Sequence, residues 1–330
     1  MKKNFKTCDF FAGIGGVRLG FEKAGFTTVF ANDFDKSCKE TYDLNFNEPK
    51  LNTEDINFLD ISKIPKFDVL LGGFPCQAFS IAGYRKGFKD DKGRGNLFFK
   101  IAEILEERKP EAFLLENVKN LKSHDKGNTF KVIEKTLKTL GGFGYHVKAK
   151  VLNSMTHGNV PQNRERIFIV GFLDKNKADA FDFPEEIKLT KNFRQYTSNQ
   201  ANDKYYYNDK PLYEKIKKDV DSEYTVYQWR RKYVRSNKKG VCPTLTANMG
   251  LGGHNVPIIK NHKGIRKLTP RECFLLQGFP RSFKIPKGVT DSKLYHQAGN
   301  SVTVPVIQRI AENIMFVLNG GIINSQKTLD

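Results

Sequence analysis

The chain has 330 residues, of which 39% are hydrophobic, so it is long and apolar enough to bury a core in one large domain and a smaller one. Its five cysteines are scattered and never form a Cys-x-x-Cys pair, which argues against a disulfide framework, a structural zinc site and an exported protein. No long apolar run predicts a membrane span, so a cytoplasmic location is expected, and a formal charge of +19 favours a polyanionic partner.

Six short apolar runs with helical patterns between them define the first half of the chain. They cover residues 6–13, 26–33, 68–73, 111–117, 145–153 and 166–173. Two helical stripes lie between them, one formed by Leu97, Phe98, Ile101, Ile104 and Leu105 and the other by Phe130, Ile133, Leu137 and Leu140. Strands that alternate with sheet-covering helices predict an α/β fold with a largely parallel sheet.

The pattern changes after about Leu173, where a polar stretch rich in Asn, Lys and Tyr begins, and a domain boundary is expected near Pro184. Residues 224–271 hold eleven Lys or Arg and no Asp or Glu, which favours a local basic surface, although a solvated charged face has the same composition. Apolar periodicity returns between Val304 and Leu318. This last helix is expected to pack back onto the large domain.

The first two runs end in residues that suit a cofactor. The first is followed by Ala12-Gly13-Ile14-Gly15-Gly16, whose glycines let a ligand approach the backbone, and the second ends at Asp33, which can accept hydrogen bonds from ribose hydroxyls. A tight strand-to-helix turn and an N-cap Asp would explain the same residues. Together they favour an adenosine-bearing cofactor, with NAD and S-adenosylmethionine both open.

The next two runs end in residues that suit catalysis. Cys76 lies in a loop that Pro75 restricts and that Gly72 and Gly73 leave accessible, while Glu116 follows a buried strand. A lone cysteine usually fills a core and a carboxylate can cap a helix. Because carboxyl ends of parallel strands meet at one edge of the sheet, a thiol and a carboxylate beside a nucleoside pocket form a coherent pair.

The chain resembles the DNA cytosine-5 methyltransferase family, whose motifs occur in order as DFFAGIGG, GFPCQAFS, ENV, QNRER, RKLTPREC and QAGNSV. The resemblance covers the chain from Phe10 to about Val302. It implies a Rossmann-like sheet of the S-adenosylmethionine-dependent methyltransferases, with a second, smaller target-recognition domain. The implied domains are residues 1–184 for catalysis and cofactor binding, 185–264 for target recognition, and 265–330 for the return to the catalytic domain.

The same resemblance implies a set of residues that bind S-adenosylmethionine. Asp33 would hold the ribose, Phe34 would lie against the adenine, and Asp55 would accept from the adenine amino group. Asp55 is preferred to Asp60 for its distance from the IP pair at residues 64–65. The implied set is Phe11, Ala12, Gly13, Ile14, Gly16, Asp33, Phe34, Asp55, Ile56, Pro75, Asn300, Ser301 and Val302.

For the chemistry, the resemblance implies that Cys76 adds to C6 of cytosine and thereby makes C5 nucleophilic. Glu116 would bond N3 and the exocyclic amine, and Arg166 would contact O2 with Arg164 in support, while Gln162 shapes the loop. Cys76, Glu116, Arg164 and Arg166 are thus the expected catalytic residues. No metal is expected.

Since a base inside a duplex cannot reach a thiol, the target cytosine is expected to be flipped out of double-stranded DNA. Residues 80–96 resemble the family's mobile loop. The expected DNA-binding residues are Ser80, Arg85, Arg230, Arg231, Arg235, Thr244, Leu245, Gly252 and Gly253. Whether the arginines bind base edges or phosphates stays open, with phosphates preferred for most.

A bacterial restriction-modification system is the expected setting, with a monomeric enzyme, no membrane and a cognate restriction endonuclease as a further partner. The sequence does not predict the target site. One alternative is a tRNA methyltransferase of the same family, whose CFT tripeptide this chain lacks. An NAD-dependent oxidoreductase and an inactive DNA-binding subunit are the others, and the GFPCQ and ENV motifs count against both.

Overall fold

The computed structural model describes residues 3–74, 97–237, 240–251 and 256–323. The predicted site residues that lie outside the described ranges are Pro75, Cys76, Ser80, Arg85, Gly252 and Gly253. The chain forms two compact units, of which the first comprises Met1–Leu152, Glu165–Glu185 and Ile307–Asp330 and the second Asn153–Arg164 and Glu186–Val306. After Glu185 the chain passes from the first unit into the second, close to the boundary expected near Pro184. The second unit then continues beyond residue 264 to Val306.

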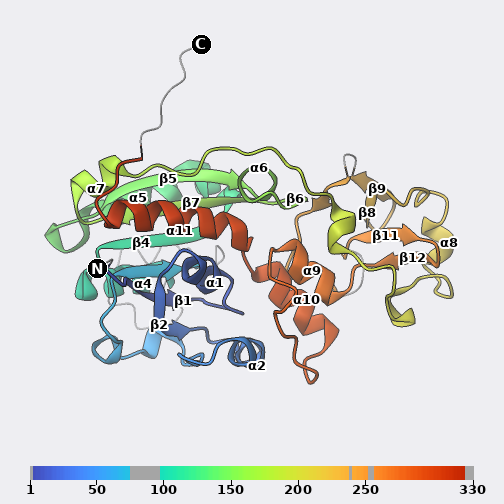
Figure 1. Cartoon of the computed structure of the whole chain (residues 1–330), viewed down its shortest axis with the longest axis horizontal. Helices are drawn as coiled ribbons and strands as arrows, with labels where there is room; N and C mark the ends of the chain where they lie inside the picture. Colours follow the sequence, from blue (N-terminus) through green and yellow to red (C-terminus); the bar gives the residue numbers. More distant parts are fainter. Residues whose placement is uncertain (1–2, 75–96, 238–239, 252–255, 324–330) are drawn as a thin grey trace, which may run out of the picture. The chain divides into compact units, whose positions relative to one another are not determined.

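A six-stranded sheet in the order β2-β1-β3-β4-β7-β5 forms the centre of the first unit (Figure 1). Its strands are β2 (Thr27–Asn32), β1 (Lys6–Phe10), β3 (Val69–Gly72), β4 (Ala112–Val118), β7 (Glu165–Phe172) and β5 (His146–Asn153). The first four are parallel to one another, whereas β7 runs antiparallel to β4. The predicted α/β fold with a largely parallel sheet is confirmed.

Helices cover this sheet, and the sequence predicted the apolar stripes of two of them, α4 and α5. They are α1 (Gly16–Lys23), α2 (Lys36–Asn45), α4 (Leu97–Arg108), α5 (Asn128–Thr139) and α7 (Lys175–Ala180). In α4, Phe98 and Ile101 are fully buried, and in α5 Ile133 and Leu137 join them in the same core as Leu115 of β4. Burying these side chains fixes α4 and α5 against the sheet.

The last helix, α11 (Val304–Leu318), packs onto the first unit from Ile307 onward, as the sequence predicted. A Cβ on Gly20 of α1 would lie 2.5 Å from Cγ2 of Ile307, so the two helices approach closely where that glycine stands. Asn313 also donates to the carbonyl of Asp182 at 2.8 Å. Asp291–Leu318 is apolar and long enough to cross a membrane by length and composition alone, but 56% of its most apolar stretch is buried, as in a core helix.

The second unit is built from short strands and helices. A four-stranded antiparallel sheet has the order β12-β11-β8-β9, and β6 pairs in parallel with β10. These strands are β6 (Gln162–Asn163), β8 (Val226–Trp229), β9 (Val234–Asn237), β10 (Cys242–Pro243), β11 (Ile258–Asn261) and β12 (Gly264–Lys267). The helices are α6 (Ser154–Gly158), α8 (Tyr213–Ile216), α9 (Pro270–Leu276) and α10 (Asp291–Asn300).

Tyr227 lies in the hydrophobic core of the small sheet. Its ring is 1% exposed within a core that includes Ile216 and Ile258, and Trp229 packs against the edge of that core. The Tyr227 hydroxyl donates to Asp221 at 2.6 Å. Tyr227 therefore stabilises the small sheet.

Candidate functional site

The carboxyl ends of the four parallel strands lie side by side at one edge of the large sheet. Phe10 at the end of β1 is in register with Asn32 of β2 and with Gly72 of β3, and Gly72 is in register with Leu115 of β4. Ligands of open α/β sheets bind beyond this edge. The four segments that the sequence singled out therefore all begin at the same edge.

A tight loop follows β1 and carries three residues in the left-handed region of backbone space, Phe11 at φ 56°, Gly13 at φ 54° and Gly15 at φ 82°. The amide of Gly15 donates to the carbonyl of Ala12 at 2.8 Å, which closes the turn. At Gly15 a Cβ would also lie 2.3 Å from Cε2 of Phe46. Glycine is therefore required there on both conformational and steric grounds.

Asp33 links this loop to the end of β2. Its Oδ2 accepts from the amide of Gly13 at 2.8 Å and its Oδ1 accepts from the amide of Asp35 at 2.9 Å. A carboxylate oxygen accepts more than one hydrogen bond, so Asp33 can bind a ligand hydroxyl while it holds the loop. The next residue, Phe34, exposes 66% of its surface. An exposed ring beside a fixed carboxylate suits a nucleoside.

Asp55 lies next to β2 because Asn32 at the end of that strand donates to the carbonyl of Glu54 at 2.8 Å. The Asp55 carboxylate caps a short helix, η1 (Ile56–Phe58), by accepting from the amide of Asn57 at 2.9 Å. Asp60 is exposed and caps the following turn in the same way. The tie to Asn32 thus places Asp55 beside the sheet edge, as its predicted role requires.

Asp9, the residue before Phe10 in β1, was missed by the sequence analysis. Its side chain is fully buried, Oδ2 accepts from the amide of Arg18 at 3.2 Å, and Oδ1 has no partner among the described residues. Burial raises the pKa of Asp9 to about 7. The signal for Asp9 in the sequence was an acidic residue inside an otherwise apolar run.

The backbone that leads from β3 toward Cys76 is held by the ENV segment. Asn117 donates from its side chain to the carbonyl of Phe74 at 2.8 Å, and both residues are buried. Asn117 therefore fixes the last described residue before the predicted nucleophile. This positioning role of Asn117 was not foreseen.

The other four cysteines are poor nucleophiles. Cys8, Cys38, Cys242 and Cys273 are all buried. Burial raises the pKa of each of these thiols above its ordinary value. Because the thiolate is the reactive form, none of the four is suited to covalent catalysis.

Glu116 and Arg166 form an ion pair at the end of β4. The antiparallel register sets Arg166 opposite Val118, which makes it a diagonal neighbour of Glu116. Nε of Arg166 lies 3.1 Å from Oε1 of Glu116, and the side chains are only 16% and 13% exposed. Burial lowers the pKa of Arg166 while Glu116 opposes the change. Nη1 of Arg166 also donates to the carbonyl of Glu165 at 2.8 Å, which fixes the guanidinium.

Arg164 lies in the second unit and is 2% exposed. Its guanidinium donates to the carbonyls of Leu245 at 2.7 Å and Gly299 at 3.0 Å, and also to that of Ser301. These bonds join three segments that are far apart in the sequence. Arg164 thus positions the backbone around Asn300 to Val302, and its supporting part in catalysis stays a prediction.

Gln162 has the loop-shaping geometry that the sequence predicted. Its Nε2 donates to the carbonyl of Leu276 at 2.7 Å, and its Oε1 accepts from the amide of Leu245 at 3.0 Å. The Leu245 side chain is fully buried. Its predicted contact with DNA is therefore not supported, and Leu245 instead anchors the loop that carries Thr244.

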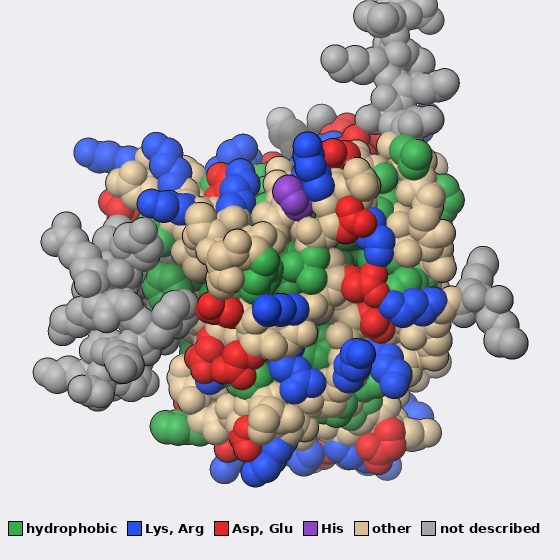
Figure 2. All heavy atoms as spheres, turned by 90° about the vertical axis from the view of Figure 1, so that its left-hand side faces the viewer, with side chains coloured by type: hydrophobic (Ala, Val, Ile, Leu, Met, Phe, Trp, Pro, Cys, Tyr) green, Lys and Arg blue, Asp and Glu red, His purple; other side chains and the backbone are tan. Residues whose placement is uncertain are grey.

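Only some of the basic side chains in residues 224–271 lie at the surface. Arg266 is fully buried and forms a two-pronged ion pair with Glu272, Nη2 to Oε1 at 2.7 Å and Nη1 to Oε2 at 2.8 Å. Figure 2 shows the side of the molecule that is on the left in Figure 1, away from this stretch, and basic and acidic side chains are interspersed there. Net charge alone therefore does not locate a polyanion site.

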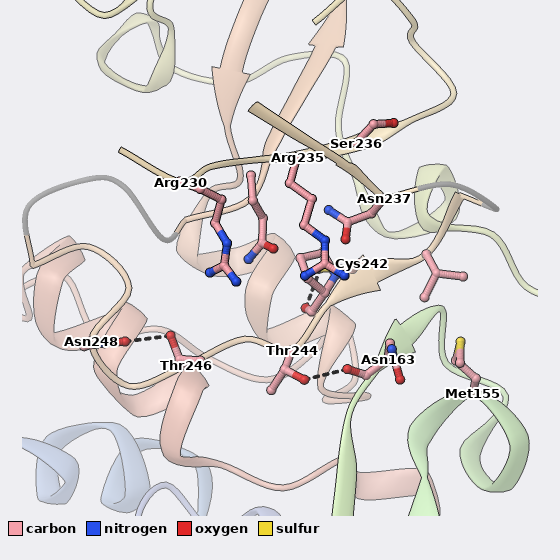
Figure 3. Close-up of a pocket in the computed structure, with 13 residues that line it drawn as sticks. Met155, Asn163, Arg230, Arg235, Ser236, Asn237, Cys242, Thr244, Thr246 and Asn248 are labelled. Atoms are coloured by element: carbon pink, nitrogen blue, oxygen red, sulfur yellow. Dashed lines mark hydrogen bonds between the residues drawn. The ribbon is translucent and has the colours of Figure 1, made fainter. Parts of the chain in front are cut away.

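A cavity of about 700 Å³ in the second unit is lined by several predicted DNA-binding residues (Figure 3). Arg230 and Arg235 extend into it, and Thr244 lies on its opposite side. Arg231 sits in the hairpin turn with φ 66° and does not line the cavity. The structure thus brings Arg230, Arg235 and Thr244 together and separates Arg231 from them.

Comparison with known proteins gives a consistent result. A family model described as C-5 cytosine-specific DNA methylase matches residues 5–315. The chain is 53% identical over 309 residues to the type II methyltransferase M.Bsp6I of Bacillus sp. strain RFL6, covering 92% of this chain and 96% of the relative. It is 43% identical over 320 residues to M.HaeII of Haemophilus aegyptius, covering 96% and 95%. The S. pombe Dnmt2 methyltransferase shares the fold, with a TM-score of 0.72 at 21% identity over 96% of this chain and 100% of that one.

Proposed function

Because this chain belongs to the C-5 cytosine-specific DNA methylase family and is a DNA cytosine-5 methyltransferase, we propose which of its residues bind the methyl donor, activate the base and hold the DNA. Its type II relatives support a place in a bacterial restriction-modification system. The observation that carries the proposal is the shared sheet edge at which the glycine loop, Asp33 and the Glu116–Arg166 pair begin.

S-adenosylmethionine is the proposed methyl donor, and the residues present fit it. A Cβ on Gly13 would lie 4.0 Å from the Asp33 carboxylate, so the missing side chain leaves room for a ligand beside that acid. Asp33 would accept from the ribose hydroxyls, Phe34 would cover the adenine, and Asp55 would accept from its amino group. The bound donor supplies an electrophilic methyl group for C5. The remaining predicted residues, Phe11, Ala12, Ile14, Gly16, Ile56, Pro75 and Asn300 to Val302, would enclose it.

Cys76 is the proposed nucleophile. Its sulfur would form a bond to C6 of cytosine, and the C5–C6 double-bond electrons would shift so that C5 can attack the methyl group. After transfer, H5 leaves as a proton to solvent and the electrons of that bond expel the sulfur. The buried state of the other four cysteines supports the assignment, because burial keeps their thiols protonated.

Glu116 is the proposed partner of the pyrimidine edge at N3 and the exocyclic amine, where charge develops as sulfur adds. Its Oε1 is held by Arg166, while its Oε2 points toward Gly73, where an added Cβ would lie 3.7 Å away. Arg166 uses Nε and Nη1 within the protein, and we propose that Nη2 contacts the cytosine O2.

Residues 185–264 are the proposed target-recognition domain, and residues 1–184 and 265–330 are the proposed catalytic part, although residues 265–306 cluster with the second unit. Ser80, Arg85, Arg231, Gly252 and Gly253 are proposed contacts to the DNA around a flipped cytosine. The single set of motifs supports a monomer, and the scattered cysteines support a cytoplasmic location. The type II relatives support a cognate restriction endonuclease in the same system.

The test is methylation of duplex DNA and of tRNA by the purified full chain with S-adenosylmethionine. Bisulfite sequencing should show methylation at cytosines of one short sequence in the DNA, and the tRNA should remain unmethylated. Methylation of tRNA in preference to DNA would overturn the assignment. A Cys76→Ser chain should bind the same DNA without methylating it.

A further inference from the structure

Three polar side chains share one face of the β8–β9 hairpin. Gln228 of β8 is paired with Arg235 of β9, so their side chains project from the same face of the two-stranded ribbon. Arg230 follows Gln228 by two residues and continues that face. The amide of Arg230 donates to the carbonyl of Tyr233 at 2.8 Å, which closes the hairpin and fixes the spacing.

These three side chains line the cavity of Figure 3. Its thirteen lining residues, all within the described part of the second unit, include two arginines and four side-chain amides but no carboxylate. Two other arginines of this unit are neutralised by carboxylates, in the pairs Arg194–Glu223 and Arg266–Glu272. Within the described residues no ion pair involves Arg230 or Arg235. The cavity is thus a positively charged site without an internal counter-ion.

Gln228 shows what kind of ligand the cavity fits. Gln228 is 7% exposed and lines the cavity, where its amide can meet a ligand. A side-chain amide carries a donor and an acceptor side by side, so a ligand that supplies both an acceptor and a donor can use the whole group. A phosphate presents only acceptors and would leave the Gln228 carbonyl unsatisfied. A base edge in the major groove presents donors and acceptors side by side.

The arginines complete this pattern. A guanidinium matches O6 and N7 of guanine with two parallel hydrogen bonds, and a two-stranded ribbon fits the width of the major groove. We propose that Gln228, Arg230 and Arg235 are specificity-determining residues, with the arginines reading guanines of the target and Gln228 reading an adjacent base pair. This inference rests on the proposed function and adds residue-level base recognition to it.

The first test is a methylation profile on a library of duplexes randomised around cytosine, read by bisulfite sequencing. Arg235→Lys keeps the charge but loses the planar fork, and Gln228→Met keeps the volume but loses the amide. Each should relax the preference at one position by about tenfold or more while methylation of cytosine continues. Lys232→Gln is the matched control, because Lys232 is an exposed cation of the same hairpin that does not line the cavity. It should weaken methylation equally at all sequences.

The second test replaces guanine at the affected position with 7-deazaguanine, which lacks the N7 acceptor. The unaltered chain should lose about tenfold in methylation rate, whereas Arg235→Met, which has no donor for N7, should lose little more. The inference is overturned if the losses caused by 7-deazaguanine and by the substitution of Arg235 are additive. It is also overturned if the substitution slows methylation equally at all sequences, as Lys232→Gln should. Either result would assign the arginines to phosphates. If the unaltered chain methylates no duplex, the proposed function itself fails, which is a distinct outcome.

Discussion

Replacement of Arg164 tests whether this residue positions the backbone or takes part in the chemistry. Arg164→Met keeps the volume of the side chain but removes the guanidinium that serves the carbonyls of Leu245, Gly299 and Ser301. Charge-assisted hydrogen bonds contribute about 1.5–3 kcal/mol each, and they are not additive. Since water and backbone shifts would satisfy some of the freed carbonyls, we expect a loss of about 3–5 kcal/mol in the free energy of unfolding.

The assay is urea unfolding followed by the fluorescence of Trp229, the single tryptophan of the chain, which lies in the second unit. With a urea slope of about 2 kcal/mol per molar, the expected loss lowers the midpoint by about 1.5–2.5 M. Arg164→Lys keeps the charge and can serve one or two carbonyls, so its midpoint should fall between those of the two other chains.

The catalytic readout separates the two roles. Under conditions where Arg164→Lys remains folded, its methyl-transfer rate at saturating DNA should stay within a few-fold of that of the unaltered chain. An unchanged urea midpoint together with a hundredfold slower transfer would refute the positioning role and place Arg164 at the reacting base.

Three further outcomes are expected. Arg166→Lys loses the planar donors that hold Glu116, so kcat should fall about 100-fold with little change in KM for DNA, and an unchanged kcat in steady-state assays would contradict this. Asp33→Asn keeps an acceptor for the Gly13 amide but loses the charge, so calorimetry should find S-adenosylmethionine binding about tenfold weaker; equal affinity would exclude Asp33 from that site. Burial raises the pKa of Asp9 from its ordinary 3.8 to about 7, so the stability this carboxyl contributes is present below pH 3.8 and lost as pH rises toward 7. The urea midpoint should therefore fall between pH 5 and pH 8 more for the unaltered chain than for Asp9→Asn, and parallel curves would contradict the buried ionisation.

The sheet and its covering helices could be predicted because their apolar periodicity records burial directly. Phe98 and Ile101 of α4, and Ile133 and Leu137 of α5, repeat at helical spacing and are buried as that spacing indicates. The glycine loop after β1 and Asp33 after β2 were also visible, because glycines and an acid at the carboxyl ends of neighbouring parallel strands are typical of a nucleoside site. The antiparallel β7 was not visible, since strand direction depends on the path of the connection and not on the residues of the strand.

Tertiary partners explain what the sequence could not predict. Arg266 belongs to an acid-free stretch, and only the fold reveals that Glu272 neutralises it in the core. Arg164 carries the same charge as Arg166, but one binds backbone carbonyls and the other a carboxylate. The sequence could not predict a role for Gln228, because a glutamine in a short strand belongs to no motif. Only the fold places it beside two arginines in one cavity.

The central claim is that Cys76 attacks C6 of a cytosine, and a duplex carrying 5-fluorocytosine at the target position tests it most directly. Fluorine cannot leave C5 as a cation, so methyl transfer would leave the sulfur bonded to C6 and the complex trapped. With S-adenosylmethionine present, denaturing electrophoresis should show a covalent complex of chain and DNA, and Cys76→Ser should show none while it still binds the duplex. A duplex that is methylated in the unfluorinated form yet gives no covalent complex when fluorinated would contradict the mechanism.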